Sequence, residues 1–275
     1  MTPREWERYL VKATEKVRRK VSPIARREGR GKKVGVGAAG DITIYADRAA
    51  EDELLRSLGG RARILSEEAG SVGDGESEVL AIVDPLDGSS NFARGIPFYC
   101  TSVAIARGTS TDDVTVGVVR DLVSGDVYSS VRGGGARKNG KRIHTSRTGD
   151  VSKAVVGVDF GGGGEETARR LAPLVGGARR QVHFGADALE LCFVAEGRTD
   201  ALVDLRGRIR VTDLAAALLI AQEAGGVVTQ EDGREVDLAF DLGRRLNFVA
   251  SANQGLHRQI LQLIGGGAER RSMPS

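Results

Sequence analysis

Cysteine and histidine, the residues of zinc and redox sites, are scarce in this chain of 275 residues. It has two cysteines without CxxC spacing, Cys100 and Cys192, and three scattered histidines, His144, His183 and His257. Both cysteines lie in apolar stretches, so we expect buried free thiols and a reducing compartment, with the cytoplasm as the default location. The scarcity disfavours a Cys/His zinc site, and we interpret the histidines as structural or surface residues.

Long apolar runs and a strong excess of one charge are also missing. No stretch of 18 apolar residues occurs and residues 1–20 are charged throughout, so we expect no signal peptide and no membrane span. Forty basic residues nearly balance 37 acidic ones, so we expect no nucleic-acid partner. Basic residues near the N-terminus predict a solvated helix face and a flexible loop, although Lys32 or Lys33 could lie near an anionic substrate.

Apolar periodicity predicts alternating helices and strands. The predicted helices are 4–28, 47–58, 165–175, 186–195, 212–224 and 254–264. The predicted strands are 63–65, 79–83, 101–106, 114–119, 127–131, 154–160, 201–205 and 246–250. Glycine-rich residues 29–40 predict a mobile loop, and Asn139-Gly140 predicts a hairpin turn. We expect two closely packed halves, 1–150 and 151–264, followed by a disordered tail at 265–275.

Acidic residues follow two neighbouring predicted strands. Glu67 and Asp84 each stand at the carboxyl end of such a strand, where sites tend to be built in α/β proteins. Pro85 forces the chain to turn, which lets Asp84 and Asp87 face one point. Asp213, at the start of a predicted helix, is either a further member of this group or only an N-cap.

The residues after Asp87 suit a phosphate group. Gly88 permits close approach of the backbone to a ligand, and the next three residues supply hydroxyl and amide groups at the start of a predicted helix, namely Ser89, Ser90 and Asn91. Several converging carboxylates raise one another's pKa, and a divalent cation relieves this repulsion. Because the candidate ligands are oxygen atoms, the sequence predicts Mg²⁺, or Mn²⁺, rather than zinc.

These motifs resemble the inositol monophosphatase superfamily. The stretch at 84–92, DPLDGSSNF, is similar to the central motif of that family, and nine ordered positions are a specific signal. Supporting similarities lie at 40–47, 64–68, 133–141, 213–217 and 223–226, and the resemblance covers about residues 5–262.

The resemblance implies a five-layer αβαβα fold, a homodimer, and a phosphomonoesterase that uses two or three Mg²⁺ ions per subunit. It implies metal ligation by Glu67, Asp84, the carbonyl of Leu86, Asp87 and Asp213. It also implies that Glu67, Asp47 and Ser89 are catalytic, with Asp47 and Ser89 positioning or deprotonating the attacking water. Ser89 stands where the family usually has threonine, and Thr212 stands where it often has tryptophan.

The substrate is less constrained than the reaction. The resemblance implies substrate contacts by Asp87, Gly88, Ser89, Asp187, Asp204 and Arg206. The segment 204–212 is longer than usual and carries three arginines, including Arg206, whose planar fork suits a second phosphate. This resembles archaeal-type members that act on both inositol 1-phosphate and fructose 1,6-bisphosphate, although Asp187, Asp204 and Arg206 could instead form a surface salt bridge.

Other functions remain as alternatives or are set aside. A nucleotide phosphatase of the same superfamily, acting on NADP or 3'-phosphoadenosine 5'-phosphate, and a non-catalytic partner-binding member stay open. Residues 35–40 match GxGxxG, but no strand precedes them and no helix follows directly. Residues 135–141 nearly match a P-loop, but they coincide with the predicted hairpin. No GxSxG motif of a serine hydrolase occurs.

Overall fold

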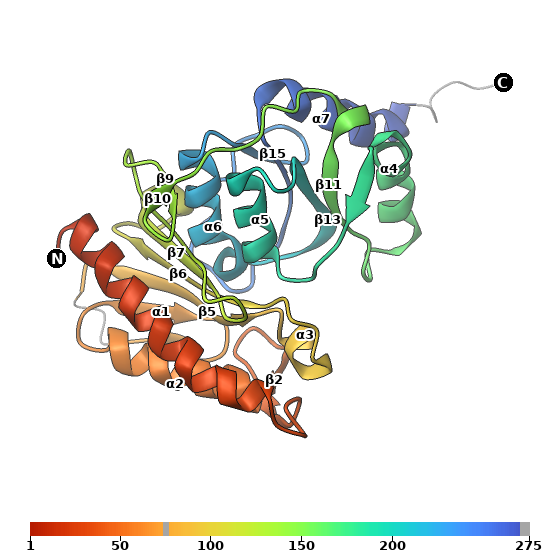
Figure 1. Cartoon of the computed structure of the whole chain (residues 1–275). Helices are drawn as coiled ribbons and strands as arrows, with labels where there is room; N and C mark the ends of the chain where they lie inside the picture. The colour runs from red at the N-terminus through yellow and green to blue at the C-terminus, as the bar shows by residue number, and fades with distance from the viewer. Residues whose placement is uncertain (74–76, 270–275) are drawn as a thin grey trace.

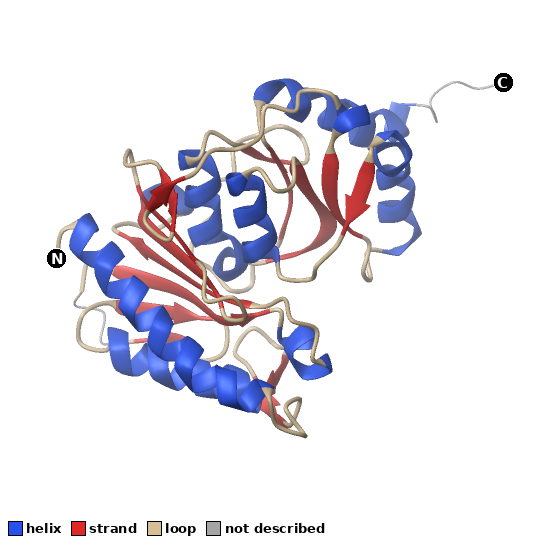
Figure 2. Ribbon diagram, viewed as in Figure 1, coloured by secondary structure: helices blue, strands red, loops and turns tan. Residues whose placement is uncertain are grey.

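Five alternating layers of helix and sheet build the protein, whose structure is a computed structural model describing residues 1–73 and 77–269 (Figures 1 and 2). One outer layer is α1 (Pro3–Ala25) and α2 (Tyr45–Leu58), the central layer is α5 (Asp187–Glu196) and α6 (Val211–Glu223), and the other outer layer is α4 (Gly164–Gly177) and α7 (Gln254–Glu269). A sheet lies on each side of the central layer. This arrangement confirms the predicted αβαβα fold.

The first sheet has eight strands in the order β10-β9-β8-β7-β6-β5-β3-β4. Their bounds are β3 (Arg63–Ser66), β4 (Gly70–Val72), β5 (Leu80–Asp87), β6 (Cys100–Ala106), β7 (Val114–Asp121), β8 (Val127–Val131), β9 (Ala136–Lys138) and β10 (Lys141–Arg142). Neighbouring strands are antiparallel except for β3 and β5, which are parallel. That parallel pair brings the ends of two acidic segments to the same edge of the sheet.

The second sheet has five strands in the order β12-β11-β13-β15-β14. Their bounds are β11 (Val155–Asp159), β12 (Arg180–Val182), β13 (Ala201–Ile209), β14 (Val227–Gln230) and β15 (Leu246–Ser251). Strand β11 is parallel to β12 and β13, whereas β15 is antiparallel to both of its neighbours. A separate hairpin joins β1 (Lys33–Val36) to β2 (Ile42–Ile44), and the short helix α3 (Ser89–Arg94) follows β5.

Strict alternation along β5 assigns its side chains to two different cores. Ala81 and Val83 pack with α1 and α2, whereas Leu80 and Ile82 pack with α5 and α6. Because successive side chains of a strand point to opposite faces, a sheet buried on both sides must be apolar at nearly every position. The same rule explains why β5 appears in the sequence as a continuous apolar run.

Helix α6 lies between the two sheets and is apolar around its whole circumference, as expected for a helix without a solvent face. Small residues let it approach the first sheet closely. A Cβ atom added at Gly117 of β7 would lie 2.5 Å from the carbonyl oxygen of Ala216. The start of α6, which carries Asp213, is therefore held at a fixed distance from the edge of the first sheet.

The structure differs from the sequence prediction at several segments. Part of the loop predicted at 29–40 forms β1, whose four residues are all exposed, so no apolar alternation signals the strand. Helix α7 continues to Glu269, so residues 265–269 are helical rather than disordered. Residues 270–275 of the predicted tail lie outside the described residues. Four short strands, β2, β4, β12 and β14, were not predicted. Within the described residues, no helix combines the length and apolar character needed to cross a bilayer.

Replacing Gly117 with alanine should destabilise the fold. The new methyl group would meet backbone atoms of α6, which cannot yield as a flexible side chain does, and such overpacking costs about 1–3 kcal/mol. Urea unfolding measures the effect. Gly176→Ala is the matched control, because no atom lies within 4 Å of a Cβ at that helical position. Equal stability of the two variants would contradict the close contact between α6 and β7.

Candidate metal and phosphate site

The parallel pairing of β3 and β5 brings Glu67 and Asp84 together. Ser66 is in register with Val83, and the backbone N–H of Glu67 donates to the carbonyl of Val83 at 3.2 Å. The next residue of each segment is thus a carboxylate at the same edge of the sheet. Asp84 is only 2% exposed.

A β-bulge brings Asp87 to the same edge. Asp84 is opposite Ser102 and Asp87 is opposite Cys100, so β5 has one more residue than β6 between these pairs. Pro85 has no N–H to donate to the ladder, and bulges are the positions where strands accommodate proline. We predicted that Pro85 would end the strand, and this was wrong, because the bulge lets β5 continue to Asp87.

Contacts from both sides hold the carboxyl groups of β5. The backbone N–H of Leu86 donates to Asp84 Oδ1 at 3.0 Å. The backbone N–H of Ala188, in the first turn of α5, donates to Asp87 Oδ2 at 2.8 Å. The central helical layer therefore orients a carboxylate that belongs to the first sheet.

Asp213 is the third residue of α6, and its side chain joins the acidic group. It accepts a hydrogen bond from the backbone N–H of Arg210 at 3.0 Å and one from Thr212 Oγ1 at 3.0 Å. Carboxylate oxygens of Glu67, Asp84 and Asp213 lie within 4.8 Å of one another. The N-cap interpretation of Asp213 is therefore wrong, because the N-cap of α6 is Arg210, and the side chain of Asp213 belongs to the acidic group.

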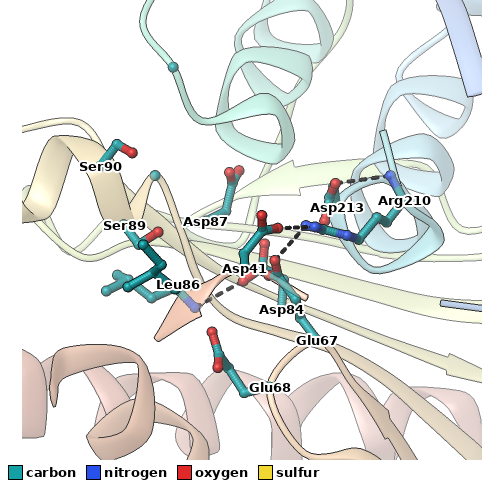
Figure 3. Close-up of a pocket in the computed structure, with 13 residues that line it drawn as sticks. Asp41, Glu67, Glu68, Asp84, Leu86, Asp87, Ser89, Ser90, Arg210 and Asp213 are labelled. Atoms are coloured by element: carbon teal, nitrogen blue, oxygen red, sulfur yellow. Dashed lines mark hydrogen bonds and ion pairs between the residues drawn. The ribbon is translucent and has the colours of Figure 1, made fainter. Parts of the chain in front are cut away.

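These carboxylates surround a cavity of about 420 Å³, which we call the acidic cavity and define by Glu67, Asp84, Asp87 and Asp213 (Figure 3). Burial is the largest cause of a raised pKa at each of the four, and repulsion from neighbouring carboxylates adds to it at Glu67, Asp84 and Asp87. The pKa of Asp87 rises to about 7. A divalent cation relieves this accumulation of like charge, so the donor set fits a metal ion with oxygen ligands.

Gly88 connects β5 to α3 in a conformation that requires glycine. Its φ is 88°, and a Cβ there would lie 3.0 Å from the carbonyl oxygen of Phe98. Asn91 donates through Nδ2 to Phe98 at 2.8 Å and to the carbonyl of Phe184 at 2.6 Å. These bonds fix the turn that exposes Ser89 on the wall of the acidic cavity.

Asp47 is buried in the first turn of α2. The backbone N–H of Ile44 donates to its Oδ2 at 2.6 Å, while its buried Oδ1 has no hydrogen-bond partner in the described part of the chain. Burial raises the pKa of Asp47 to about 7. The side chain does not line the acidic cavity itself.

The substrate residues predicted in the second half lie at a neighbouring pocket of about 450 Å³. We call it the arginine pocket and define it by Arg206, Arg208, Arg210 and Arg245. Asp187 also lines it, whereas Asp204 does not, because Asp204 is fully buried beneath Arg206.

Arg206 is held by three carboxyl groups. Its Nε donates to Asp204 Oδ2 at 2.9 Å, its Nη2 lies 3.5 Å from Asp187, and its Nη1 forms an ion pair with Asp159. The predicted residues Asp187 and Asp204 therefore both contact the third predicted residue, Arg206. Asp159 is an additional member that sequence reasoning missed, because β11 and β13 become neighbours only in the folded sheet.

Arg210 is the other residue that sequence reasoning missed. Its Nη1 lies 2.6 Å from Glu67 Oε1 and its Nη2 pairs with Asp41, so its guanidinium enters the acidic cavity (Figure 3). The only available signal was the run of arginines before Asp213. Nothing in the sequence connects Arg210 with Glu67, which is 143 positions away.

Comparison with known proteins agrees with this geometry. The model of the inositol monophosphatase family matches residues 6–266. The chain is 38% identical over 273 residues to the fructose-1,6-bisphosphatase/inositol-1-monophosphatase of Methanothermobacter thermautotrophicus, covering 94% of this chain and 96% of that protein. A bifunctional NADP phosphatase/NAD kinase of Methanococcus maripaludis is 32% identical over 270 residues, which are 90% of this chain and 47% of that protein.

A solved structure leads to the same conclusion. The crystal structure of an inositol monophosphatase–fructose 1,6-bisphosphatase has a TM-score of 0.85 at 28% identity, covering 94% of this chain and 99% of that one. The chain belongs to the inositol monophosphatase family, a family of metal-dependent phosphatases. It is a phosphoric monoester hydrolase that acts on a small phosphorylated substrate.

In the metal-free protein, Asp87 should make stability fall as the pH rises. An unfolded aspartate titrates at about 3.9, whereas the pKa of folded Asp87 is about 7. Between these values the folded chain keeps a proton that the unfolded chain has released, which lowers stability by up to about 1.4 kcal/mol per pH unit. Urea unfolding in EDTA at several pH values measures the slope. Asp87→Asn should have a shallower slope, and equal slopes would contradict the raised pKa.

Proposed function

We propose that the protein is a Mg²⁺-dependent phosphomonoesterase that hydrolyses inositol 1-phosphate, fructose 1,6-bisphosphate, or both. The observation that carries this proposal is the acidic cavity, in which oxygens of Glu67, Asp84 and Asp213 lie within 4.8 Å of one another. A turn built around Gly88 and Ser89 borders the same cavity and is suited to a phosphate group.

The metal would be held by the carboxylates of the acidic cavity and by the carbonyl of Leu86. Their donors are all oxygen atoms, which favours Mg²⁺, with Mn²⁺ as the alternative, in two or three sites. When bound, such ions neutralise phosphate oxygens, make water a better nucleophile at neutral pH and stabilise the leaving oxygen. The raised pKa values of the buried carboxylates support this assignment. They indicate that the positive groups of the protein do not neutralise all of these carboxylates.

The residues of the chain have separate tasks in the proposed reaction. Asp87, Gly88 and Ser89 would orient the phosphate at the edge of the first sheet. Asp47 does not line the acidic cavity, so it would help to position or deprotonate the attacking water through the Ser89 hydroxyl, with Glu67 completing the catalytic group. The free Oδ1 of Asp47 and its pKa of about 7 support this role, because a general base works best when its pKa lies near the operating pH.

The arginine pocket would bind the part of the substrate distant from the reacting phosphate. Arg206 supplies a guanidinium fork on its wall, and Asp187 supplies a carboxylate for a sugar or cyclitol hydroxyl. Asp204 is buried, so we now propose that it positions Arg206 and does not contact the substrate. Four arginines on one pocket favour a substrate with a second anionic group.

A nucleotide phosphatase of the same superfamily is the second candidate. The similarity to a bifunctional NADP phosphatase/NAD kinase favours it, and the arginine pocket could also bind the pyrophosphate of NADP. A non-catalytic, partner-binding role is disfavoured, because every proposed metal ligand is present.

We also propose a homodimer, as the family resemblance implies, and a cytoplasmic location. Cys100 and Cys192 are both buried and free, which suits a reducing compartment.

Removing a carboxylate of the acidic cavity should abolish metal-dependent turnover. Asp84→Asn and Asp213→Asn should each lower kcat by at least about 100-fold, the loss typical of removing one electrostatic stabiliser of a transition state. Phosphate release from inositol 1-phosphate, fructose 1,6-bisphosphate and NADP is measured with Mg²⁺ and with EDTA. Glu165→Gln, which alters an exposed carboxylate of α4, is the matched control. Normal kcat in both variants, or no Mg²⁺-dependent turnover of any substrate by the wild type, would contradict the proposal.

Replacing Arg206 should discriminate between substrates. Arg206→Ala should raise KM for fructose 1,6-bisphosphate about tenfold more than KM for inositol 1-phosphate. The reason is that only the bisphosphate has a second phosphate, whose charge-assisted contact with Arg206 would be lost. Arg244→Ala, a neighbouring arginine outside the arginine pocket, should leave the ratio of the two KM values unchanged. A thermal melt controls for the loss of three ion pairs. Equal effects on both substrates would assign Arg206 a structural role only.

A further inference from the structure

Arg210 bridges three segments that are distant in the sequence. It lies just before α6 and its side chain is only 12% exposed. The guanidinium contacts Glu67, which follows β3, and Asp41, in the turn between β1 and β2. Figure 3 shows the guanidinium inside the acidic cavity, among the side chains of Asp41, Glu67 and Asp213.

The guanidinium supplies positive charge where the buried carboxylates need it. Its Nη1 lies 2.6 Å from Glu67 Oε1, a charge-assisted hydrogen bond. Glu67 is also one of the three residues whose oxygens converge within 4.8 Å. A divalent cation placed among those oxygens would be close to the guanidinium, and two positive charges at that separation repel each other. Arginine cannot escape this repulsion by losing a proton, since it stays charged in proteins.

The bridge is built so that it can open. The buried Nε atom of Arg210 has no hydrogen-bond partner in the described part of the chain, so the guanidinium is not fully satisfied. Its partner Asp41 is 64% exposed and can be hydrated when the contact breaks. Arg210 also lines the arginine pocket, so this pocket adjoins its guanidinium on the side away from Glu67.

The β1–β2 hairpin is tied to the same place. The backbone N–H groups of Ala38 and Ala39 donate to the carbonyls of Glu68 and Glu67, at 2.9 and 3.1 Å. The contact between Arg210 and Asp41 adds a tie from the hairpin to the other half of the chain. In the part of the chain that the structure describes, the other hydrogen bonds of the hairpin join it to residues of its own half.

We propose that Arg210 is an internal competitor of the divalent cation: it neutralises Glu67 in the metal-free protein, and binding of the metal displaces it from Glu67 and Asp41. Metal binding is thereby coupled to loss of the contact between Arg210 and the hairpin turn, and the guanidinium leaves the acidic cavity for the arginine pocket that it already lines. The inference rests on the proposed function, since it requires that the acidic cavity binds a metal.

Calorimetric titration of the EDTA-treated, dialysed protein with MgCl₂ tests the competition without any assay of turnover. Arg210→Gln should bind Mg²⁺ about tenfold more tightly than the wild type, because one competing charge-assisted hydrogen bond is removed. Arg208→Gln is the matched control: it removes the same charge from the same segment, but its guanidinium contacts the carbonyl of Gly162, and its Mg²⁺ affinity should stay within about twofold of wild type.

Two further measurements make the result independent of one variant. At a fixed Mg²⁺ concentration, the rise in melting temperature on adding the metal should be larger for Arg210→Gln than for the wild type, because tighter binding stabilises more. Arg210→Lys keeps the charge but lacks the planar fork that bridges two carboxylates, so its affinity should be intermediate. If Arg210→Gln does not fold, Arg210→Lys decides: tighter binding than wild type supports competition, and equal or weaker binding overturns it.

Asp84→Asn separates failure of this inference from failure of the proposed function. If Asp84→Asn and the wild type bind Mg²⁺ alike, or neither binds it, the acidic cavity is not the metal site and both proposals are wrong. If Asp84→Asn loses binding while Arg210→Gln retains the wild-type affinity, the metal site stands and the competition is overturned. Weaker binding by Arg210→Gln would show that Arg210 assists the metal, which also overturns competition.

Discussion

Buried negative charge is the constraint around which this molecule is organised. Glu67, Asp84, Asp87 and Asp213 meet at one edge of the first sheet, where burial raises the pKa of each. No fold gathers such residues for its own stability, because each carboxylate loses hydration and repels its neighbours. The parallel pair β3–β5, the bulge at Pro85 and the close packing of α6 on β7 together hold them in place. The free-energy cost of gathering these carboxylates is offset when a cation binds among them. The fold is thereby linked to metal-dependent chemistry.

The two halves of the chain share the site through the central helical layer. Three of the four carboxylates come from the first half, and Asp213 comes from the start of α6. The first turn of α5 orients Asp87 through the N–H of Ala188, and Asn91 binds the carbonyl of Phe184 in the other direction. Because α5 and α6 pack between both sheets, one hydrophobic core joins residues from the two halves that the sequence predicts.

The two arginines beside the site, Arg206 and Arg210, differ in how firmly their guanidinium groups are held. Arg206 is locked by Asp204, Asp187 and Asp159, which suits a residue that must present its fork in one orientation. Arg210 has fewer satisfied donors and an exposed partner in Asp41, which suits a residue that moves. The arginine-rich segment before α6 therefore combines a rigid guanidinium and a displaceable one, although both appear in the sequence as members of the same run.

The amino-acid sequence by itself determined the local features. The spacing of Asp84, Pro85 and Asp87 indicated two carboxylates that face one point, and Gly88 indicated a turn after them, because proline and glycine restrict the backbone wherever they occur. Continuous apolar runs indicated strands covered on both faces, and the family motif implied the five layers and the ligand set. These inferences depend on near neighbours in the chain, whose geometry covalent structure and periodicity control.

Only the tertiary structure decided what depends on contacts between distant segments. The exposed β1 strand carries no apolar signal, and its existence depends on pairing with β2. The bulge that lets β5 continue to Asp87 depends on the register with β6. The burial of Asp204 beneath Arg206, on which its proposed positioning role rests, became visible only in the folded sheet. The contact of Arg210 with Glu67 joins residues 143 positions apart, and no local rule of propensity or spacing acts over that separation.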